Sequence, residues 1–229
     1  MTQTPWQPGP AAPALADGVV DVWRSDLADA AAHDAVRELL SLAERERATR
    51  FARVEDGRRW SAARGILRAL LGAYAHRDPR TLRFAEGAHG KPALAGDPAP
   101  RLRFNLSHSG DVALCAFALD REVGIDVELP RRAVDHVAIA RRILGDAEAE
   151  RLQALGARER ERAFLRAWVR WEAVLKCRGT GIGGAEREPA GGEDAWVQEL
   201  DFDPPGAAAL AVEDGPATVR CFRWPPASR

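Results

Sequence analysis

Three acidic side chains and one lysine are spaced along the chain in a way that suits a divalent cation and a phosphate group. Asp126 and Glu128 alternate on a predicted strand, residues 123–129, so both carboxylates project from one face with Cα atoms about 6.5–7 Å apart. Glu172 and Lys176 lie one turn apart on a predicted helix. Three carboxylates suit Mg²⁺, which prefers oxygen ligands. Taken singly, these residues could also form the solvent-exposed face of an edge strand and an ordinary helical ion pair.

Two further segments contain groups that could bind phosphate oxygens. Residues 104–110 (FNLSHSG) are predicted to leave a strand and enter a turn, where the Ser107 hydroxyl, turn N–H groups and a protonated His108 could contact a phosphate. Lys91 lies in a loop rich in glycine and proline. Lys91 and Lys176 are the two lysines of the sequence, in which arginine is otherwise used. Lysine presents a compact point charge where arginine presents a planar fork. The alternatives are a plain turn residue for His108 and a solvated loop lysine for Lys91.

An arginine-rich segment covers residues 44–68, with eight arginines against four acidic residues in a chain of net charge −1. Arginine forks suit phosphate groups, so this segment could bind an anionic ligand. It could equally form the solvated face of a helix, held by pairs such as Glu46 and Arg50.

The elements that must position these residues alternate between helices and strands. Helices are predicted over 33–50, over 58–74 with Asp56 as its cap, and over 134–143, 146–155 and 158–178, the last ending at Gly179. Strands are predicted over 18–23, near 81–84, and over 101–106, 112–119 and 123–129. Residues 181–194 are predicted to be a mobile loop, and residues 207–213 and 217–224 a closing hairpin.

A weak internal repeat divides these elements into two sets. Residues 20–22 (VDV) resemble residues 125–127 (IDV), and at similar distances downstream residues 60–68 (WSAARGILR) resemble residues 168–176 (WVRWEAVLK). The repeat predicts an α+β protein of two similar halves with a ligand groove between them. The predicted division is a flexible leader over 1–16, an N-terminal half over 17–121 and a C-terminal half over 122–229.

Composition excludes several classes of protein. The 229 residues contain no long apolar run that could span a membrane, and the first residues lack the pattern of a signal peptide. The three cysteines have no CxxC spacing, which favours a reducing cytoplasm over a disulfide framework or a zinc site. Cations and anions nearly balance, 33 against 34, which argues against nucleic-acid binding. We therefore expect a cytoplasmic protein, and the internal duplication favours a monomer.

The order of these motifs resembles the 4′-phosphopantetheinyl transferases of the surfactin-synthetase type over roughly residues 18–224. The most specific matches are VGIDVE and WxxxEAxxK, and the motifs GKP and FNLSHSG support them. The resemblance implies two α+β halves related by a pseudo-twofold axis. It also implies coenzyme A as the donor of the phosphopantetheine group, a serine of an acyl or peptidyl carrier protein as the acceptor, and 3′,5′-ADP as the leaving group.

The resemblance also implies roles for individual residues. Asp126, Glu128 and Glu172 would hold Mg²⁺ on the pyrophosphate, and Lys176 would steady that group. The residues that would contact the phosphates of the coenzyme are Lys91, Ser107 and His108, with Arg47 and Arg59 matching basic positions before the long N-terminal helix. Glu172 is also the candidate general base.

One residue departs from the family pattern. The family usually has a lysine directly before the helix glutamate, and this chain has Trp171. A charge near the reaction centre is therefore missing, which bears on rate and acceptor choice. Two alternatives stay open: a non-catalytic relative that only binds carrier proteins, and another metal-dependent phosphate enzyme such as a nuclease or phosphatase.

Overall fold

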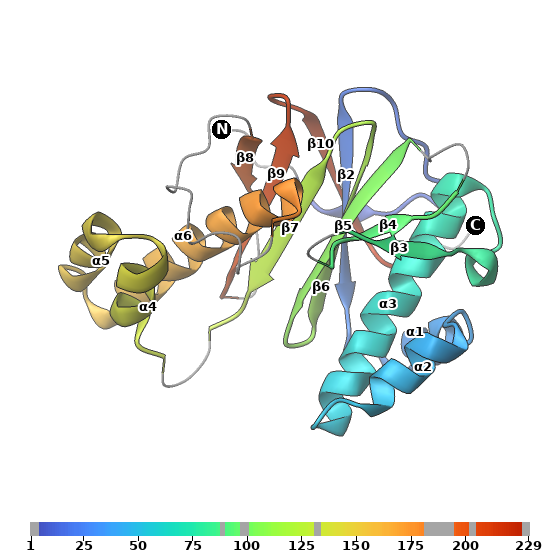
Figure 1. The fold of residues 1–229 in the computed structure, drawn as a ribbon, viewed down its shortest axis with the longest axis horizontal. Helices are drawn as coiled ribbons and strands as arrows, with labels where there is room; N and C mark the ends of the chain where they lie inside the picture. The colour runs from blue at the N-terminus through green and yellow to red at the C-terminus, as the bar shows by residue number, and fades with distance from the viewer. Residues whose placement is uncertain are drawn as a thin grey trace.

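The protein was analysed as a computed structural model that describes residues 5–87, 90–96, 101–130, 134–180, 195–201 and 205–225. Its regular elements form two main sheets, a short hairpin and six α-helices within these ranges (Figure 1). No helix among the described residues combines the length and the apolar character that crossing a bilayer requires.

The larger sheet has five strands in the order β1-β10-β2-β6-β5. Its strands are β1 (Gln7–Pro8), β2 (Val19–Asp26), β5 (Leu102–Ser109), β6 (Val112–Leu119) and β10 (Thr218–Arg223). β2, β6 and β5 are antiparallel neighbours, whereas β10 runs parallel to both β1 and β2. The sheet therefore combines the two ends of the chain with its middle.

The smaller sheet has three antiparallel strands in the order β7-β9-β8. They are β7 (Val123–Glu128), β8 (Ala195–Glu199) and β9 (Ala207–Glu213). A separate pair of short strands, β3 (Phe84–Glu86) and β4 (Pro92–Leu94), follows the 3₁₀ turn η1 (Pro79–Thr81).

Two helices of 22 residues each define the two halves, α3 (Val54–Ala75) and α6 (Ala157–Arg178). The short helices α1 (Ala30–Arg37) and α2 (Leu42–Thr49) accompany α3, and α4 (His136–Ile143) and α5 (Asp146–Gln153) accompany α6. Figure 1 shows α3 and α6 on opposite sides of the strands. The predicted α+β fold with two similar halves is confirmed.

Three apolar clusters hold the helices and the sheets together in layers. One lies between α3 and the larger sheet and contains Trp23, Ile66 and Phe117. A second joins the two sheets, because Val20 and Val22 of β2 pack with Ile125 and other apolar residues of β7 and β9. A third lies under α6, α4 and α5 against the alanine-rich outer face of β9. The layers are thus helix, sheet, sheet and helix, and burial of these faces drives their association.

The predicted hairpin of 207–213 and 217–224 is wrong. β9 lies between β7 and β8 in the smaller sheet, whereas β10 crosses to the larger sheet and pairs with β2. In Figure 1 the red strand β10 lies beside the blue strand β2. Short connections favour hairpins, but β10 buries Cys221 and Phe222 in the larger sheet, and this tertiary burial overrides the local pattern.

The predicted single helix over 33–50 is also wrong, because the chain forms α1 and α2 with a break between them. Ser41 begins α2 through a capping box, in which its hydroxyl accepts from the Glu44 N–H and the Glu44 carboxylate accepts from the Ser41 N–H. Asp56 lies inside the first turn of α3, which begins after Arg53, and is not its cap. The strand expected near 81–84 begins only at Phe84.

Most of the predicted leader over 1–16 lies within the described residues and contacts the folded domain. Gln7 and Pro8 pair with β10, and the Trp6 indole donates to the Asp201 carbonyl at 2.7 Å. A Cβ on Gly9 would lie 2.0 Å from the Trp23 ring, so this part of the chain packs tightly on the sheet. The predicted loop over 181–194 lies outside the described residues.

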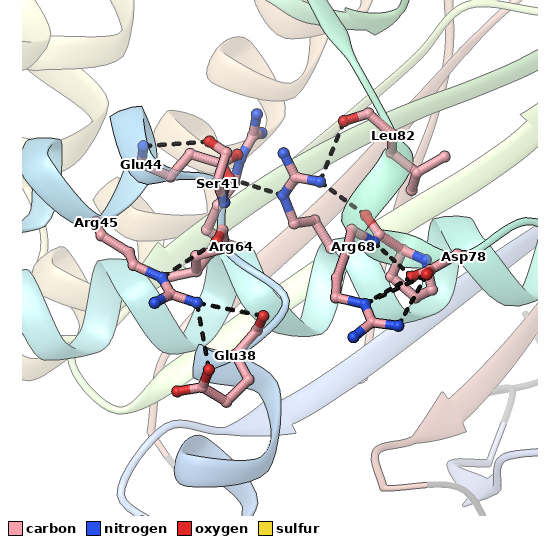
Figure 2. Close-up of polar contacts among 11 residues, drawn as sticks. Glu38, Ser41, Glu44, Arg45, Arg64, Arg68, Asp78 and Leu82 are labelled. Atoms are coloured by element: carbon pink, nitrogen blue, oxygen red, sulfur yellow. Dashed lines mark hydrogen bonds and ion pairs between the residues drawn. The ribbon is translucent and has the colours of Figure 1, made fainter.

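A buried carboxylate ties α2 to α3 (Figure 2). The Glu44 side chain accepts from Arg64 Nε at 2.5 Å and from Arg68 Nε at 2.7 Å, and Arg68 also donates to the carbonyls of Pro79 and Leu82. Burial alone would raise the pKa of Glu44, but the hydrogen bonds from the two arginines outweigh it and hold the pKa below its usual value. Part of the arginine-rich segment is therefore structural.

Replacing Glu44 with glutamine is expected to lower the free energy of unfolding by about 3–5 kcal/mol, because the buried Arg68 loses its counter-charge. The Glu44 pKa is lower in the folded state, so its stabilising effect is present above the unfolded pKa and is lost as pH falls through the folded pKa. Urea unfolding at several pH values measures this, with the exposed Glu38→Gln as the control. A stability difference between wild type and Glu44→Gln that does not shrink at acid pH would contradict the assignment.

Candidate active site

Helix α6 lies directly against β7 because β7 carries a glycine at the contact. A Cβ on Gly124 would lie 2.0 Å from the Ala173 carbonyl oxygen and 2.3 Å from the Cys177 nitrogen. Val123, Ile125 and Val127 face the core between the sheets, so Gly124, Asp126 and Glu128 share the other face, where α6 packs. Asp126 is only 3% exposed, so it does not belong to a solvent-exposed strand face.

Three of the predicted site residues meet across this contact. Lys176 Nζ on α6 donates to Asp126 Oδ1 at 2.5 Å and lies 3.5 Å from Glu172 Oε2. A single ammonium group thus contacts both carboxylates, which are close neighbours although 46 residues of chain separate them. The Asp126 and Glu172 side chains are 4% and 13% exposed, so this charge cluster is largely shielded from water.

The third carboxylate, Glu128, is close enough to influence Glu172 electrostatically. Burial raises the pKa of Glu172, Lys176 opposes this, and the negative charges of Asp126 and Glu128 raise the pKa further. The pKa of Glu172 is therefore raised from the usual value of glutamate. Two of the three predicted acidic side chains, Asp126 and Glu172, therefore meet at Lys176, and Glu128 acts on Glu172 electrostatically.

Strand β5 borders the carboxylates with three alternating polar side chains. Asn105 Oδ1 accepts from the Ile125 N–H at 2.9 Å, and Ser107 Oγ donates to Asp126 Oδ1 at 2.7 Å. Ser109 Oγ donates to Glu128 Oε2 at 2.8 Å. Sequence reasoning missed Asn105 and Ser109, although their two-residue spacing around Ser107 is the signal of one strand face.

The predicted turn at FNLSHSG is wrong in part, because these residues continue β5 as far as Ser109 and the turn begins at Gly110, with φ at 54°. Ser107 and His108 are strand residues that point to opposite faces. Ser107 is buried beside Asp126 and Lys176, whereas His108 is exposed on the other face. Ser107 contacts the carboxylate cluster directly.

Lys91 lies at the other end of the β7–α6 contact. Its ammonium group donates to Glu122 Oε2 at 2.6 Å and to the carbonyls of Val123 and Cys177, each at 3.0 Å. The side chain is 16% exposed, so it is not a solvated loop lysine. In this position its ammonium group binds the Cys177 carbonyl near the C-terminal end of α6, where cations are favoured.

The two arginines matched by resemblance lie on the N-terminal half. Arg59 Nε donates to Asp111 Oδ1 at 2.7 Å, and Asp111 lies in the turn between β5 and β6. This hydrogen bond raises the pKa of Arg59. The Arg47 guanidinium lies over the Trp60 ring at 5.2 Å. Arg59 is thus tied to the β5–β6 turn near Ser109, while Arg47 covers the start of α3.

Trp171, at the position where the family usually has lysine, lies on a different side of α6 from Glu172. Its ring packs on Trp168 with centroids 5.3 Å apart. It also lines a cavity of about 1260 Å³ between α5, α6 and β8, together with arginines of α6. Asp126, Glu128 and Glu172 do not line that cavity. Trp171 therefore adds aromatic surface to this cavity and not to the carboxylate cluster.

The carboxylate cluster has the chemistry of a cation site. Asp126 Oδ2 is buried without a hydrogen-bond partner among the described residues, and such an atom calls for a positive ligand. Within the same residues no group of three or more His, Cys, Asp or Glu side chains already has the arrangement of a metal site. Lys176 supplies the positive charge between Asp126 and Glu172. The donor set, all carboxylate oxygens, fits Mg²⁺.

Comparison with known proteins agrees with this site. Residues 122–214 match the model of the 4′-phosphopantetheinyl transferase superfamily, and residues 23–119 match the model of a 4′-phosphopantetheinyl transferase N-terminal region. The two matches meet where β6 passes into β7. They therefore correspond to the two halves of the fold.

Characterised relatives extend this agreement to the whole chain. The chain is 37% identical to the 4′-phosphopantetheinyl transferase HetI of Nostoc sp. (strain PCC 7120) over 99% of its own length and 98% of the relative. It is 29% identical to the 4′-phosphopantetheinyl transferase Sfp of Bacillus subtilis (strain 168) over 62% of each chain. It is also 38% identical to AcpT of Salmonella typhimurium over 41% of this chain and 47% of the relative.

This chain therefore belongs to the 4′-phosphopantetheinyl transferase superfamily. The predicted activity, transfer of phosphopantetheine, and the predicted enzyme class, a transferase, are confirmed by these relatives.

Proposed function

We propose that this chain transfers the 4′-phosphopantetheine group of coenzyme A to a serine hydroxyl of an acyl or peptidyl carrier protein and releases 3′,5′-ADP. The observation that supports this most directly is the meeting of Asp126, Glu172 and Lys176 at the contact between β7 and α6. We further propose that the chain is of the surfactin-synthetase type, because one chain supplies both halves and Sfp is among its relatives.

Asp126, Glu128 and Glu172 are the residues that would hold Mg²⁺. Bound there, the ion would neutralise charge on the pyrophosphate of the coenzyme. Asp126 Oδ2 is buried and has no hydrogen-bond partner among the described residues, and Lys176 gives one positive charge to the two carboxylates of Asp126 and Glu172. A cation bound to these carboxylates would balance the remaining negative charge.

The transfer itself needs one bond to form and one to break. The carrier serine oxygen forms a bond to the β-phosphorus of coenzyme A, and the bond from that phosphorus to the bridging oxygen of 3′,5′-ADP breaks. The serine proton goes to the Glu172 carboxylate, whose raised pKa favours its acceptance. Lys176 stabilises the negative charge that develops on the phosphate oxygens. Such a reaction depends mainly on alignment and charge neutralisation.

Several predicted coenzyme contacts remain part of this proposal. Ser107 lies inside the cluster, and Arg59 is attached to the turn that follows β5. His108, Arg47 and Lys91 would contact phosphates from outside the cluster. Contact by Lys91 requires its ammonium to exchange hydrogen-bond partners, because it is bound to Glu122 and to two carbonyls. We also keep as predictions a cytoplasmic monomer that does not bind nucleic acid.

Mass spectrometry of apo carrier proteins tests the proposed function. We expect carrier proteins from polyketide, nonribosomal peptide or fatty-acid systems to gain the mass of one phosphopantetheine group when incubated with the enzyme, coenzyme A and Mg²⁺. A chelator should abolish the gain, and 3′,5′-ADP should appear in equal amount. Glu172→Gln should be inactive, while Glu150→Gln, an exposed acid on α5, should behave as wild type.

The alternatives give different outcomes in the same experiment. A carrier-binding relative without activity forms a complex with the carrier protein but leaves its mass unchanged. A nuclease or phosphatase hydrolyses nucleic acid or a phosphate ester in the absence of coenzyme A. Either result would reject the proposed transfer.

A further inference from the structure

The two sheets adjoin at β5 and β7 through side chains instead of a shared ladder of backbone hydrogen bonds. β5 is the last strand of the larger sheet and β7 the first strand of the smaller one. Asn105, Ser107 and Ser109, at every second position of β5, reach across to successive positions of β7. These three side chains fix the register of β7, because a shift by one residue would turn Asp126 and Glu128 to the opposite face.

Ser109 contacts both a side chain and the backbone where β7 ends. Its hydroxyl donates to Glu128 Oε2 at 2.8 Å and accepts from the Leu129 N–H at 3.2 Å. A serine hydroxyl has one proton to donate and lone pairs to accept with, so both bonds form at once. Ser109 is 3% exposed, so water does not readily take its place.

Ser109 contacts Glu128 at the point where the chain leaves β7. Asp126 is buried and is held by Lys176 in addition to Ser107. Glu128 ends the strand, is more exposed than Asp126, and is followed directly by Leu129 and Pro130. A hydroxyl bound to both Glu128 and the next N–H fixes the point at which the chain leaves the strand.

We propose that Ser109 is a positioning residue, which holds the Glu128 carboxylate in the orientation needed to bind a divalent cation together with Asp126 and Glu172. The proposal rests on the proposed function, because it assigns these carboxylates to the cation. Some side chains hydrogen-bond to a metal ligand without touching the ion. Mutating such a side chain typically lowers metal affinity about 10–100-fold. Loss of the Ser109 hydroxyl removes the hydrogen bond that orients Glu128 Oε2.

The chain offers a closely matched control. Ser25, on β2, is likewise buried, and its hydroxyl has no hydrogen-bond partner among the residues that the structure describes. Ser25→Ala therefore removes the same atom from a buried strand without removing a contact. Ser109→Thr retains the hydroxyl and serves as the conservative variant.

Binding of Mn²⁺ alone, followed by the electron paramagnetic resonance signal of the free ion, tests the proposal. We expect Ser109→Ala to bind Mn²⁺ about tenfold or more weakly than wild type. Ser109→Thr should retain most of the affinity, and Ser25→Ala should match wild type. Circular dichroism checks that each variant is folded; should Ser109→Ala not fold, Ser109→Cys replaces the hydroxyl with a weaker donor of similar size and should weaken binding in the same direction.

The transfer reaction supplies a second measurement. In Ser109→Ala we expect the Mg²⁺ concentration that gives half-maximal rate to rise about tenfold or more, while the rate approaches that of wild type as Mg²⁺ increases. A purely structural role would lower the rate at every Mg²⁺ concentration alike, and that result would overturn the proposal.

The outcomes separate this proposal from the proposed function. Equal Mn²⁺ affinity in wild type and Ser109→Ala, with wild type binding well, overturns the role of Ser109 and leaves the transferase proposal intact. No Mn²⁺ binding by wild type overturns the assignment of the carboxylates to a cation and the role of Ser109 with it.

Discussion

Replacing Asp126 with asparagine is expected to reduce phosphopantetheine transfer by at least about 10²–10³-fold, the loss typical for removing one preorganised electrostatic group. Asparagine has nearly the same shape, so packing against α6 should persist. The change removes the negative charge that faces Lys176 and Ser107 and that would face the metal ion. Transfer rates at saturating coenzyme A and Mg²⁺, measured on a carrier protein that wild type modifies, give the size of the effect.

Asp120→Asn is the matched control for this prediction. Asp120 lies in the turn between β6 and β7 and pairs with the exposed Arg101, and its positive φ of 54° is one that asparagine tolerates. The Asp120→Asn variant should transfer at the wild-type rate. A rate within a few fold of wild type for Asp126→Asn, with native circular dichroism, would remove Asp126 from the site.

Replacing Gly124 with alanine is expected to lower both the stability and the activity of the protein. The added methyl would lie 2.0 Å from the Ala173 carbonyl oxygen, and backbone atoms of α6 cannot rotate away as a side chain can. Overpacking of this kind costs about 1–3 kcal/mol and occasionally more. In a chain of this size the melting temperature should fall by several degrees, at about 2–4 °C per kcal/mol.

The activity of Gly124→Ala should fall together with its stability, because the helix that carries Glu172 and Lys176 must move away from Asp126. Gly156→Ala, at the start of the same helix, serves as the control, since its Cβ would have no neighbour closer than 4.0 Å and its φ of −62° suits alanine. Thermal unfolding and transfer assays on both variants measure the difference. An unchanged melting temperature in Gly124→Ala would show that β7 and α6 do not pack as closely as described.

Two local patterns in the sequence underlie the meeting of Asp126 and Glu172 at Lys176. The alternation in VGIDVE places Asp126 and Glu128 on one face, and the helical spacing places Glu172 one turn before Lys176. What joins the two patterns is Gly124, whose missing side chain lets α6 approach β7. That role depends on a contact between segments about 50 residues apart, and composition or periodicity does not reveal it.

Other features could not be predicted because non-local contacts decide them. FNLSHSG has the composition of a turn, yet the chain stays extended through Ser109 because Ser107 and Ser109 bind carboxylates of β7. The five residues of β8 follow a stretch rich in glycine and were not predicted, since their pairing with β9 defines the strand. The break between α1 and α2 was predictable, because Ser41 and Glu44 have the spacing of a capping box.

The internal repeat shows how the two halves use corresponding positions differently. Arg64 and Arg68 of α3 align with Glu172 and Lys176 of α6. In the first half these positions hold the buried Glu44 and stabilise α2 on α3, as Figure 2 shows. In the second half they form an ion cluster with Asp126, whose Oδ2 has no hydrogen-bond partner within the part of the chain that the structure describes. One half thus has its charges satisfied internally, and the other has negative charge available for a ligand.

The position of β10 has a consequence for how this protein is made. β10 lies between β1 and β2, so the larger sheet lacks an interior strand until residues 218–223 have left the ribosome. Domains usually fold in order during synthesis, from the N-terminus onward. Here the nascent N-terminal segment has one side of β2 unpaired while the rest of the polypeptide emerges, and a premature stop codon before residue 218 would leave that strand edge open to association with other chains.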